Sequence, residues 1–285
     1  MIARSWFRRV TLCTSQPEIF QAIRYLECDP EVAAEPVEEL TISVEPYRSY
    51  YRIVRNGELM REQMSAQGVT ESLHAELMFL SLADFPSAPL IHAASVRRGG
   101  RRLLLVGPKG GGKTMLTLHL IREGYDVEGD ENVFVTPDGV VPRPRGLRVK
   151  ESAAPLLPHL TEILDAAPYY QSLPGFRIYN LDPRAAGASS WRIERGRADA
   201  VVLLRPNHGG WSSMRPLSSL DLVREVMQEC GLPETGRAKA IGAIAKTIGN
   251  AKGFDLSLGE LRGAVACLDR LCQELRELLP GGCSR

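Results

Sequence analysis

The sequence predicts an α/β protein in which a small β-rich region precedes a larger α/β domain. Three observations predict this class. Apolar and polar residues alternate within 37–64, which is typical of half-buried strands. A short apolar segment, a glycine-rich loop and a helical segment follow one another over 102–122. A long amphipathic stripe ends the chain. We predict a boundary between a β-rich region, 1–87, and an α/β domain, 88–285.

Composition excludes several classes of function. The chain has 285 residues, and 35 Lys and Arg against 34 Asp and Glu leave a net charge of +1, which disfavours nucleic acid as a partner. The longest apolar runs, Leu103–Val106 and Ala200–Leu204, are far shorter than the roughly 20 residues that cross a bilayer. The segment after Arg9 is too polar for a secretory signal, so we expect a cytoplasmic protein without membrane contact. Its six cysteines show no C-x-x-C pair, and we expect reduced thiols.

Strands dominate the predicted β-rich region. The first has its apolar face at Leu40, Ile42 and Val44. Residues 47–64 predict a hairpin, because Asn56 and Gly57 accept the positive φ angles of a type I′ turn. A helix over 71–83 follows, and Thr70 is its predicted N-cap.

Strands and helices alternate in the larger domain. A strand over 102–106 precedes the glycine-rich loop, and a helix over 115–122 follows it, with Gly124 as the C-cap. Residues 125–135 predict the next strand, which a turn connects to a further short strand. Residues 151–190 predict loops.

Two capping boxes predict helices in the last third of the chain. Ser218 pairs with Asp221, and Ser257 pairs with Glu260. The second box opens the C-terminal helix. We expect its apolar stripe to face the core, with members at Leu261, Val265, Leu268, Leu271, Leu275 and Leu278.

The glycine-rich loop fits the Walker A pattern G-x-x-x-x-G-K-[ST] in its expected context, between a strand and a helix. Glycines let backbone N–H groups converge on phosphate oxygens, and the helix N-terminus adds a positive dipole. Lys113 supplies a cation for the β- and γ-phosphates, and the Thr114 hydroxyl is a ligand for Mg²⁺. The predicted nucleotide-binding residues are Gly107, Pro108, Lys109, Gly110, Gly111, Gly112, Lys113 and Thr114.

Two acids follow the helix of this loop. Asp130 lies 17 residues after Lys113 (130 − 113), and Glu131 is next to it. A strand that directly follows the helix can lie beside the loop strand, which brings its end near the γ-phosphate. One acid then holds Mg²⁺ and the other accepts a proton from an attacking hydroxyl. The alternative is a solvated acidic turn, since Asp126 and Glu128 are close by.

His92 is a further candidate, about ten residues before the loop strand. From the residues alone, a lone histidine in an apolar run is more often an ordinary core residue than a catalyst.

A basic segment follows the acids. Arg143 and Arg145 are predicted to clamp the nucleotide or an acidic substrate, because guanidinium groups bind phosphate and carboxylate bidentately. Arg205, after the apolar strand at 198–204, is a similar candidate. The alternative for the basic segment is a solvated charged loop.

The order His92-Ala-Ala-Ser, strand, glycine-rich loop, glycine-ended helix and acid pair resembles the HPr kinase/phosphorylase family. It resembles more closely the HPr-kinase-like proteins of peptide and small-molecule biosynthetic gene sets. The similarity is good over 88–150, and weaker over 37–87 and 198–279. The resemblance implies a P-loop kinase core of the HPr kinase and phosphoenolpyruvate carboxykinase type. It also suggests a homo-oligomer.

The same resemblance implies roles for individual residues. Lys113 and Thr114 bind phosphate and metal, Asp130 is the base that acts on a hydroxyl, and Glu131 lies near the metal. It also implies that His92 belongs to the active site. The family usually has Asp where this chain has Glu131, and the signature segment that follows the acid pair in the bacterial regulator is missing. HPr as substrate and a phosphorylase activity are therefore in doubt.

These observations predict an ATP-dependent phosphotransferase. With Mg²⁺, it transfers the γ-phosphoryl of ATP or GTP to a hydroxyl of a peptide, a protein or a small alcohol, in a biosynthetic or regulatory pathway. Its catalytic residues are Asp130, His92 and Lys113, and its metal ligands are Thr114, Asp130 and Glu131. One alternative is an ATPase or GTPase switch that acts on a protein partner, although the strand at 198–204 does not end in an acid. Another is a nucleotide-binding module without catalysis, which the intact loop lysine argues against.

Overall fold

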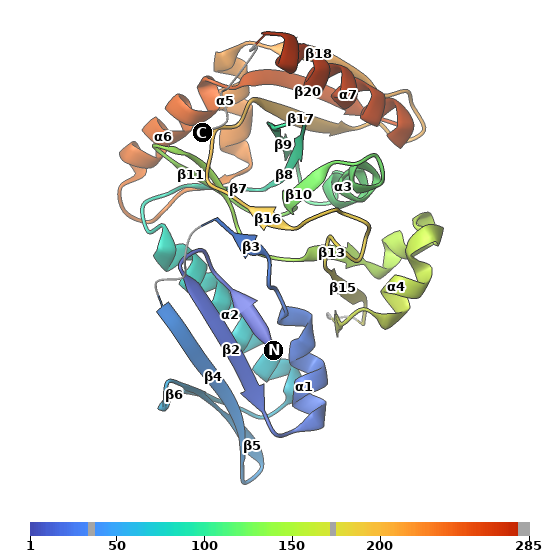
Figure 1. The fold of residues 1–285 in the computed structure, drawn as a ribbon. Coiled ribbons are helices and arrows are strands. Elements are labelled where there is room, and N and C mark those ends of the chain that lie inside the picture. Colours follow the sequence, from blue (N-terminus) through green and yellow to red (C-terminus); the bar gives the residue numbers. More distant parts are fainter. Residues whose placement is uncertain (34–37, 172–174, 279–285) are drawn as a thin grey trace. The chain divides into compact units, whose positions relative to one another are not determined.

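The computed structural model describes residues 1–33, 38–171 and 175–278 and, at Leu278, only the backbone. The chain forms two compact units. Unit 1 consists of Met1–Pro86 with Arg143–Ala186, and unit 2 consists of Ser87–Pro142 with Gly187–Arg285. The molecule is a mixed α/β protein with several sheets (Figure 1). Residues 143–186 thus belong to the unit of the N-terminal strands, whereas the predicted boundary placed them in the second domain.

Unit 1 is built on a five-stranded sheet. In order across the sheet, its strands are β1 (Ile2–Arg4), β2 (Arg8–Thr14), β4 (Glu38–Tyr47), β5 (Tyr50–Arg55) and β6 (Glu58–Gln63). Two helices, α1 (Pro17–Ile23) and α2 (Ala66–Asp84), cover one face of this sheet and share its hydrophobic core. Short elements complete the N-terminal part of the unit: η1 (Arg24–Leu26) and β3 (Glu31–Val32).

The predicted strand face and hairpin are confirmed. Leu40, Ile42 and Val44 are buried in the core. Asn56 and Gly57 have φ angles of 50° and 89°, as a tight hairpin turn between β5 and β6 requires. The sequence patterns did not predict β1, β2 or α1.

The predicted N-cap of α2 is wrong. The Ser65 hydroxyl accepts a hydrogen bond from the N–H of Gly68 at 3.1 Å, so the helix begins at Ala66. Thr70 lies one turn further on, where its hydroxyl donates to the carbonyl of Ala66 at 3.0 Å. Ser and Thr can make either bond, and the choice follows from where the chain leaves β6.

The segment predicted as loops contains regular structure. Its strands β14 (Tyr169–Gln171) and β15 (Arg177–Leu181) join β13 (Leu147–Lys150), which precedes the segment, in a three-stranded antiparallel sheet of order β13, β15, β14. Between β13 and β14 lie η2 (Glu151–Leu156), η3 (Pro158–Leu160) and α4 (Thr161–Ala166). Side chains attach this sheet to the N-terminal part of unit 1: Arg148 donates to the carbonyl of Tyr25 at 2.7 Å, and Asn180 donates to that of Glu27 at 2.8 Å. These pairings are more than 120 residues apart along the chain, so local patterns do not indicate them.

Unit 2 is built on a six-stranded sheet. Its order is β10 (Asp126–Gly129), β8 (Ala93–Arg98), β9 (Arg101–Val106), β17 (Ala200–Pro206), β20 (Lys252–Leu258) and β18 (Ser213–Leu217). The central strands β9, β17 and β20 are parallel, and the outer strands join them antiparallel. A second sheet has the order β12 (Gly139–Pro142), β11 (Val133–Thr136), β7 (Leu90–Ile91) and β19 (Cys230–Gly231). A further short strand is β16 (Arg192–Ile193).

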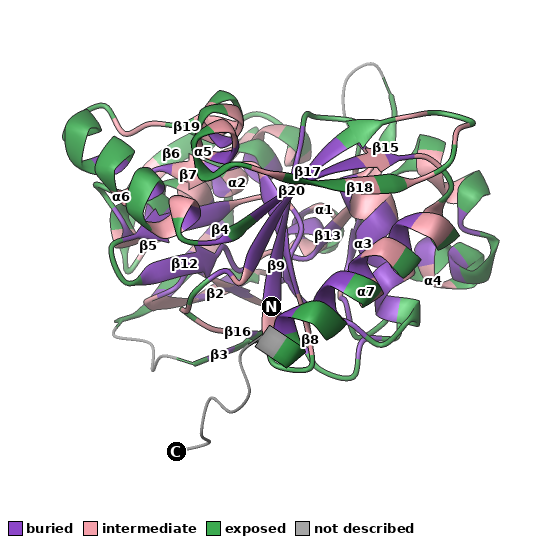
Figure 2. Cartoon of the chain, turned by 90° about the horizontal axis from the view of Figure 1, so that it is seen from above, coloured by how far each residue is buried: buried purple, intermediate pink, exposed green. Residues whose placement is uncertain are grey.

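Helices cover both faces of the central strands. Figure 2 shows α5 (Ser219–Gln228) and α6 (Arg237–Gly249) on one side of them, and α3 (Lys113–Arg122) and α7 (Leu261–Leu278) on the other. The parallel strands are buried on both faces, which explains the unbroken apolar runs at Leu103–Val106 and Ala200–Leu204.

The outcome for the predicted helix ends is mixed. The Ser218 hydroxyl accepts from the N–H of Asp221 at 3.1 Å and caps α5 as predicted. Gly124, with φ of 80°, follows α3 as predicted. Ser257 does not cap α7, because it lies inside β20 opposite Arg205 of β17.

The predicted core stripe of α7 is confirmed at Val265, Leu268, Leu271 and Leu275, which are buried, whereas the Leu278 side chain lies outside the described residues. Helix α6 was not predicted.

The predicted strand over 125–135 is interrupted at the acid pair. Its first half, β10, pairs with β8, and its second half, β11, joins the other sheet. The loop strand β9 has no room for β10 beside it. A tight turn at Gly99 and Gly100, with φ of 57° and 77°, returns β8 along one edge of β9, and β17 occupies the other edge.

The structure also bears on the expectations about membrane spans and cysteines. Within the described residues, no helix has both the length and the apolar character that a membrane span needs. The cysteines described, at positions 13, 28, 230, 267 and 272, are all free thiols, and Cys283 lies outside the described residues.

A buried ion pair connects three strands of the large sheet. The Arg102 guanidinium on β9 donates two hydrogen bonds of 2.7 Å to the Glu128 carboxylate on β10. The strand between them contributes Ser95, whose hydroxyl donates to the same carboxylate at 2.7 Å. Only 4% of Arg102 and 1% of Glu128 is exposed. Glu128 is therefore part of the interior and not of a solvated acidic turn.

Replacing Arg102 by Met is expected to destabilise unit 2 by about 3–5 kcal/mol, because the Glu128 carboxylate stays buried without its partner. Urea unfolding measures this through the fluorescence of Trp191, whose indole N–H donates to the carbonyl of Glu128 at 3.4 Å. All variants also carry Trp6→Phe and Trp211→Phe, so that Trp191 is the only tryptophan that contributes to the signal.

The matched control for this experiment is Arg224→Met. Arg224 pairs with Asp221 at 3.1 Å at the surface of α5, with 68% of its side chain exposed. An exposed pair contributes about 1 kcal/mol at most. Equal losses in the two variants would show that the buried pair does not stabilise the sheet.

Candidate active site

The glycine-rich loop connects β9 to α3 in the predicted order. The strand ends at Val106, and the helix begins at Lys113. Gly112 is the N-cap and has φ of 89°, and a Cβ there would lie 2.8 Å from Leu258 Cδ2. A Cβ on Gly107 would approach Leu204 Cβ to 3.2 Å. Glycine at these two positions therefore keeps the loop close to the neighbouring strands.

The Lys113 side chain is folded back onto the loop. Only 5% of the residue is exposed, and its ammonium donates to the carbonyls of Gly107 at 2.6 Å and Pro108 at 3.0 Å. Burial lowers the pKa of Lys113 to about 8, against the opposing charges of Glu229 and Asp130. An anion at the loop would favour the charged form and give the ammonium a stronger partner than a carbonyl.

Thr114 and Asp130 are in direct contact. The Thr114 hydroxyl donates to Asp130 Oδ2 at 2.9 Å, and 4% of Asp130 is exposed. The hydroxyl lies in the first turn of α3, and the carboxylate lies just beyond the end of β10. Two of the predicted metal ligands are thus adjacent.

A bulge sets the position of this carboxylate. Val127 pairs with Val96, but Gly129 pairs with Ser95, so Glu128 is an extra residue in β10. A bulge bends the strand and changes the direction of the residues after it. Asp130 can therefore reach Thr114 although β8 separates its strand from the loop strand.

Glu131 lies at the same break between strands. It is partly buried, and its carbonyl accepts from the N–H of Ala93 at 3.1 Å. This bond attaches the acid pair to the start of β8. The role of its carboxylate as a metal ligand stays a prediction.

His92 lies beside Lys113, as a member of the active site would. Its Nδ1 is 3.4 Å from the Lys113 ammonium and 3.8 Å from Glu229 Oε2, and 31% of its side chain is exposed. Burial, with the charges of Lys113 and Lys109, lowers the pKa of His92 to about 4. The imidazole is therefore neutral at pH 7, and its contact with Glu229 is not an ion pair at that pH.

The sequence patterns did not reveal Glu229. It follows α5, and its carbonyl accepts from the N–H of His92 at 2.9 Å. The two residues meet because Cys230 of β19 pairs with Ile91 of β7. Strands of two residues leave no periodic signal, so this contact could not be found from the sequence.

The glycine-rich loop belongs to unit 2, whereas two of the predicted arginines do not. Arg143 and Arg145 belong to unit 1, where Arg143 is buried and donates to the Ser81 hydroxyl at 3.2 Å. Their role as nucleotide ligands stays a prediction. Arg205 belongs to unit 2, but its guanidinium is held by the carboxylates of Asp255 and Glu225.

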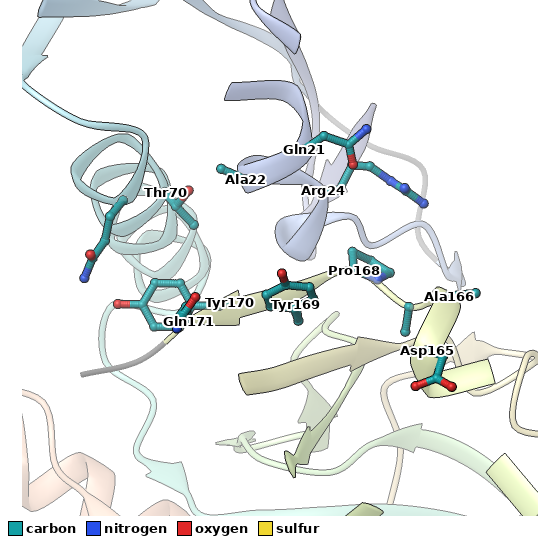
Figure 3. A pocket seen from close by; sticks show the side chains of 12 residues that line it. Gln21, Ala22, Arg24, Thr70, Asp165, Ala166, Pro168, Tyr169, Tyr170 and Gln171 are labelled. Atoms are coloured by element: carbon teal, nitrogen blue, oxygen red, sulfur yellow. The ribbon is translucent and has the colours of Figure 1, made fainter. Parts of the chain in front are cut away.

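Unit 1 also contains an open hollow of about 660 Å³, between α1, α2 and the segment around β14 (Figure 3). Tyr169 and Tyr170 line it together with Gln21, Arg24 and Asp165. None of the predicted site residues lines this hollow.

Comparisons with known proteins find a distant likeness in structure. No family model matches the sequence, and no curated protein matches it. A solved structure, the Hpr(Ser) kinase/phosphatase from Coxiella burnetii, is similar over 65% of this chain and 98% of that chain, with 12% identity and a TM-score of 0.32. The relationship is structural and distant.

The lowered pKa of His92 makes the free energy of unfolding depend on pH. The unfolded chain binds a proton at this residue near pH 6.5, whereas the folded chain binds it near pH 4. Between these values the unfolded state holds more protons, so the free energy of unfolding contributed by His92 falls as the pH is lowered. An NMR titration of the histidine side chains, assigned with His92→Gln, measures the shift directly.

The cause of the shift is tested with Lys113→Met. Removal of this positive charge should raise the pKa of His92 towards its ordinary value, and it should leave the burial contribution in place. A His92 signal that titrates near pH 6.5 in the unmodified protein would contradict the geometry described above.

Proposed function

We propose that the protein is a Mg²⁺-dependent kinase that transfers the γ-phosphoryl of ATP or GTP to a hydroxyl group. The acceptor is a Ser or Thr of a peptide or protein, or a small alcohol. The observation that carries this proposal is the 2.9 Å hydrogen bond that the Thr114 hydroxyl donates to the buried Asp130 carboxylate. Thr114 directly follows Lys113 in the chain. A cation, a hydroxyl and a carboxylate thus surround the first turn of one helix.

The residues at this point fit both a triphosphate and its metal. The α3 N-terminus and the left-handed Gly112 direct backbone N–H groups towards an anion, and Lys113 adds a positive charge. Oxygens of Thr114 and Asp130 are the ligands that Mg²⁺ prefers, and the remaining positions commonly belong to phosphates and water. When bound, Mg²⁺ neutralises charge on the phosphates. We assign the further carboxylate to Glu131.

The chain's own residues have separate tasks in the proposed reaction. Lys113 leaves the carbonyls of Gly107 and Pro108 and binds phosphate oxygens. Asp130 accepts the proton of the attacking hydroxyl at its carboxylate, a role that suits a buried acid beside the transferring group. His92 is neutral and orients the base or the acceptor through its ring nitrogens. The other loop residues, Gly107 to Gly112, bind phosphate through their backbone.

One observation disfavours the alternative of an ATPase or GTPase switch. The strand parallel to β9 in the sheet, β17, ends in Leu204-Arg205-Pro206. The acid pair comes instead from the end of β10, two strands away from β9 on the other side. An acid placed to act on an acceptor hydroxyl fits a kinase better than a switch.

Phosphoryl transfer is tested directly with γ-labelled ATP and Mg²⁺, with and without candidate acceptors encoded beside the gene. Label should appear on a hydroxyl of one acceptor. Lys113→Ala should weaken nucleotide binding about tenfold or more, because it removes a charged hydrogen-bond donor. Undiminished turnover in this variant would contradict the whole assignment of the site. Hydrolysis stimulated by a protein partner, with no labelled acceptor, would favour the switch.

The base is tested with Asp130→Asn, which keeps the size of the side chain. Nucleotide binding should persist, and transfer should fall roughly 100- to 10,000-fold, the usual contribution of general base catalysis. The control is Asp138→Asn, on a turn of the same unit with 75% of its side chain exposed, which should transfer normally. If Asp130→Asn transfers at the normal rate, another group is the base.

A further inference from the structure

Unit 1 contains a cluster of cationic side chains around a small hollow of about 20 Å³. Arg4, Arg143, Arg145 and Arg148 line this hollow, together with His74 and Cys28. They come from β1, from α2, from the segment after η1 and from the segment that leads into β13. Two of these stretches, β1 and residues 143–148, thus bring four guanidinium groups to one place.

The contacts of three of these arginines leave most of their donors unused by protein groups. Arg143 donates to the Ser81 hydroxyl at 3.2 Å, Arg148 to the Tyr25 carbonyl at 2.7 Å, and Arg4 to the Pro30 carbonyl at 3.4 Å. Within the described part of the chain, none of these three has a carboxylate partner. The Nε atoms of Arg4 and Arg148 are buried without an acceptor from any described residue.

The acids near the cluster are engaged elsewhere. Asp29 lies 3.8 Å from Arg9, and Asp182 pairs with Arg184 at 2.6 Å. The buried thiol in the hollow does not compensate the charge either, because burial raises the pKa of Cys28 to about 12. Arg4, Arg143 and Arg148 therefore keep positive charges that are paired with no carboxylate of the described residues.

Burial also lowers the pKa values of two arginines and the histidine in the cluster. Burial lowers the pKa of Arg143 to about 10 and that of Arg148 to about 9, so both stay cationic at neutral pH. Burial and the charges of the neighbouring guanidinium groups lower the pKa of His74 to about 4. The imidazole is thus neutral and faces the cations. Buried charges of one sign are costly unless a counter-charge binds among them.

We propose that Arg4, Arg143 and Arg148 form an anion-binding site in unit 1, which takes the oxyanion group of a carboxylate- or phosphate-bearing ligand. Guanidinium groups bind both kinds of oxyanion through paired hydrogen bonds. The hollow has room for about one oxygen atom, so the end of a ligand enters it and the body of the ligand stays outside. All residues of this site belong to unit 1.

The test uses inorganic phosphate and acetate as probes, at constant ionic strength against sodium chloride. Lys113→Ala serves as the background, because it weakens anion binding at the glycine-rich loop. We expect 50 mM of at least one probe to raise the melting midpoint by 2 °C or more relative to chloride, as binding to the folded state requires. Arg143→Gln in that background should lose this rise. Arg61→Gln, an exposed arginine on β6, should keep it.

A second measurement needs no change in the cluster. The bound anion favours the charged imidazole, so the probe should raise the pKa of His74 by one unit or more in an NMR titration. Phosphate and acetate separate the two sources of the oxyanion, and a response to either supports the site. Equal midpoints in all three salts with an unchanged His74 titration would overturn the proposal. So would a rise in midpoint that persists in Arg143→Gln.

Discussion

The buried pair between Arg102 and Glu128 is the constraint on which the arrangement of unit 2 depends. It joins the strand that leads into the glycine-rich loop to the strand that leads into the acid pair, and Ser95 on the strand between them completes it. Such a pair is weak evidence for stability, because the desolvation of two charges offsets most of their attraction. The main consequence of the pair is that it fixes the position of β10 in the sheet. Only one register of β10 against β8 places the Glu128 carboxylate opposite the guanidinium, and that register fixes Asp130 two residues later.

This constraint explains how a site forms across non-adjacent strands. A strand beside β9 would bring an acid to the loop directly, but β8 and β17 occupy both edges of β9. The extra residue in β10 is Glu128 itself, so the residue that makes the bulge is also the one that the ion pair holds. The bulge turns the chain, and the Asp130 carboxylate reaches the Thr114 hydroxyl at 2.9 Å. The position of the site therefore depends on an interaction in the interior of the sheet.

Local chemistry made part of this structure predictable. The Asn56-Gly57 turn, the Ser218 cap, Gly124 and the strand, loop and helix around Lys113 all follow from preferences of neighbouring residues, and each is found. Features that depend on pairing between distant segments were missed. Glu229 meets His92 through strands of two residues, and a solvated turn stayed an open alternative for Glu128 until its partner 26 residues away was placed. Ser257 carries a capping pattern, but pairing with β17 takes it into a strand.

The near-neutral total charge of the chain conceals cations that are buried in both units. At the loop, Lys113 rests on two backbone carbonyls, and burial lowers its pKa to about 8. In unit 1, Arg143 and Arg148 rest on a hydroxyl and a carbonyl, with their pKa values lowered by the same cause. In each place the direct hydrogen-bond acceptors of the cation are neutral oxygens. In both places a bound anion would offset the cost of desolvating the cation, which is the physical basis of the two proposed sites.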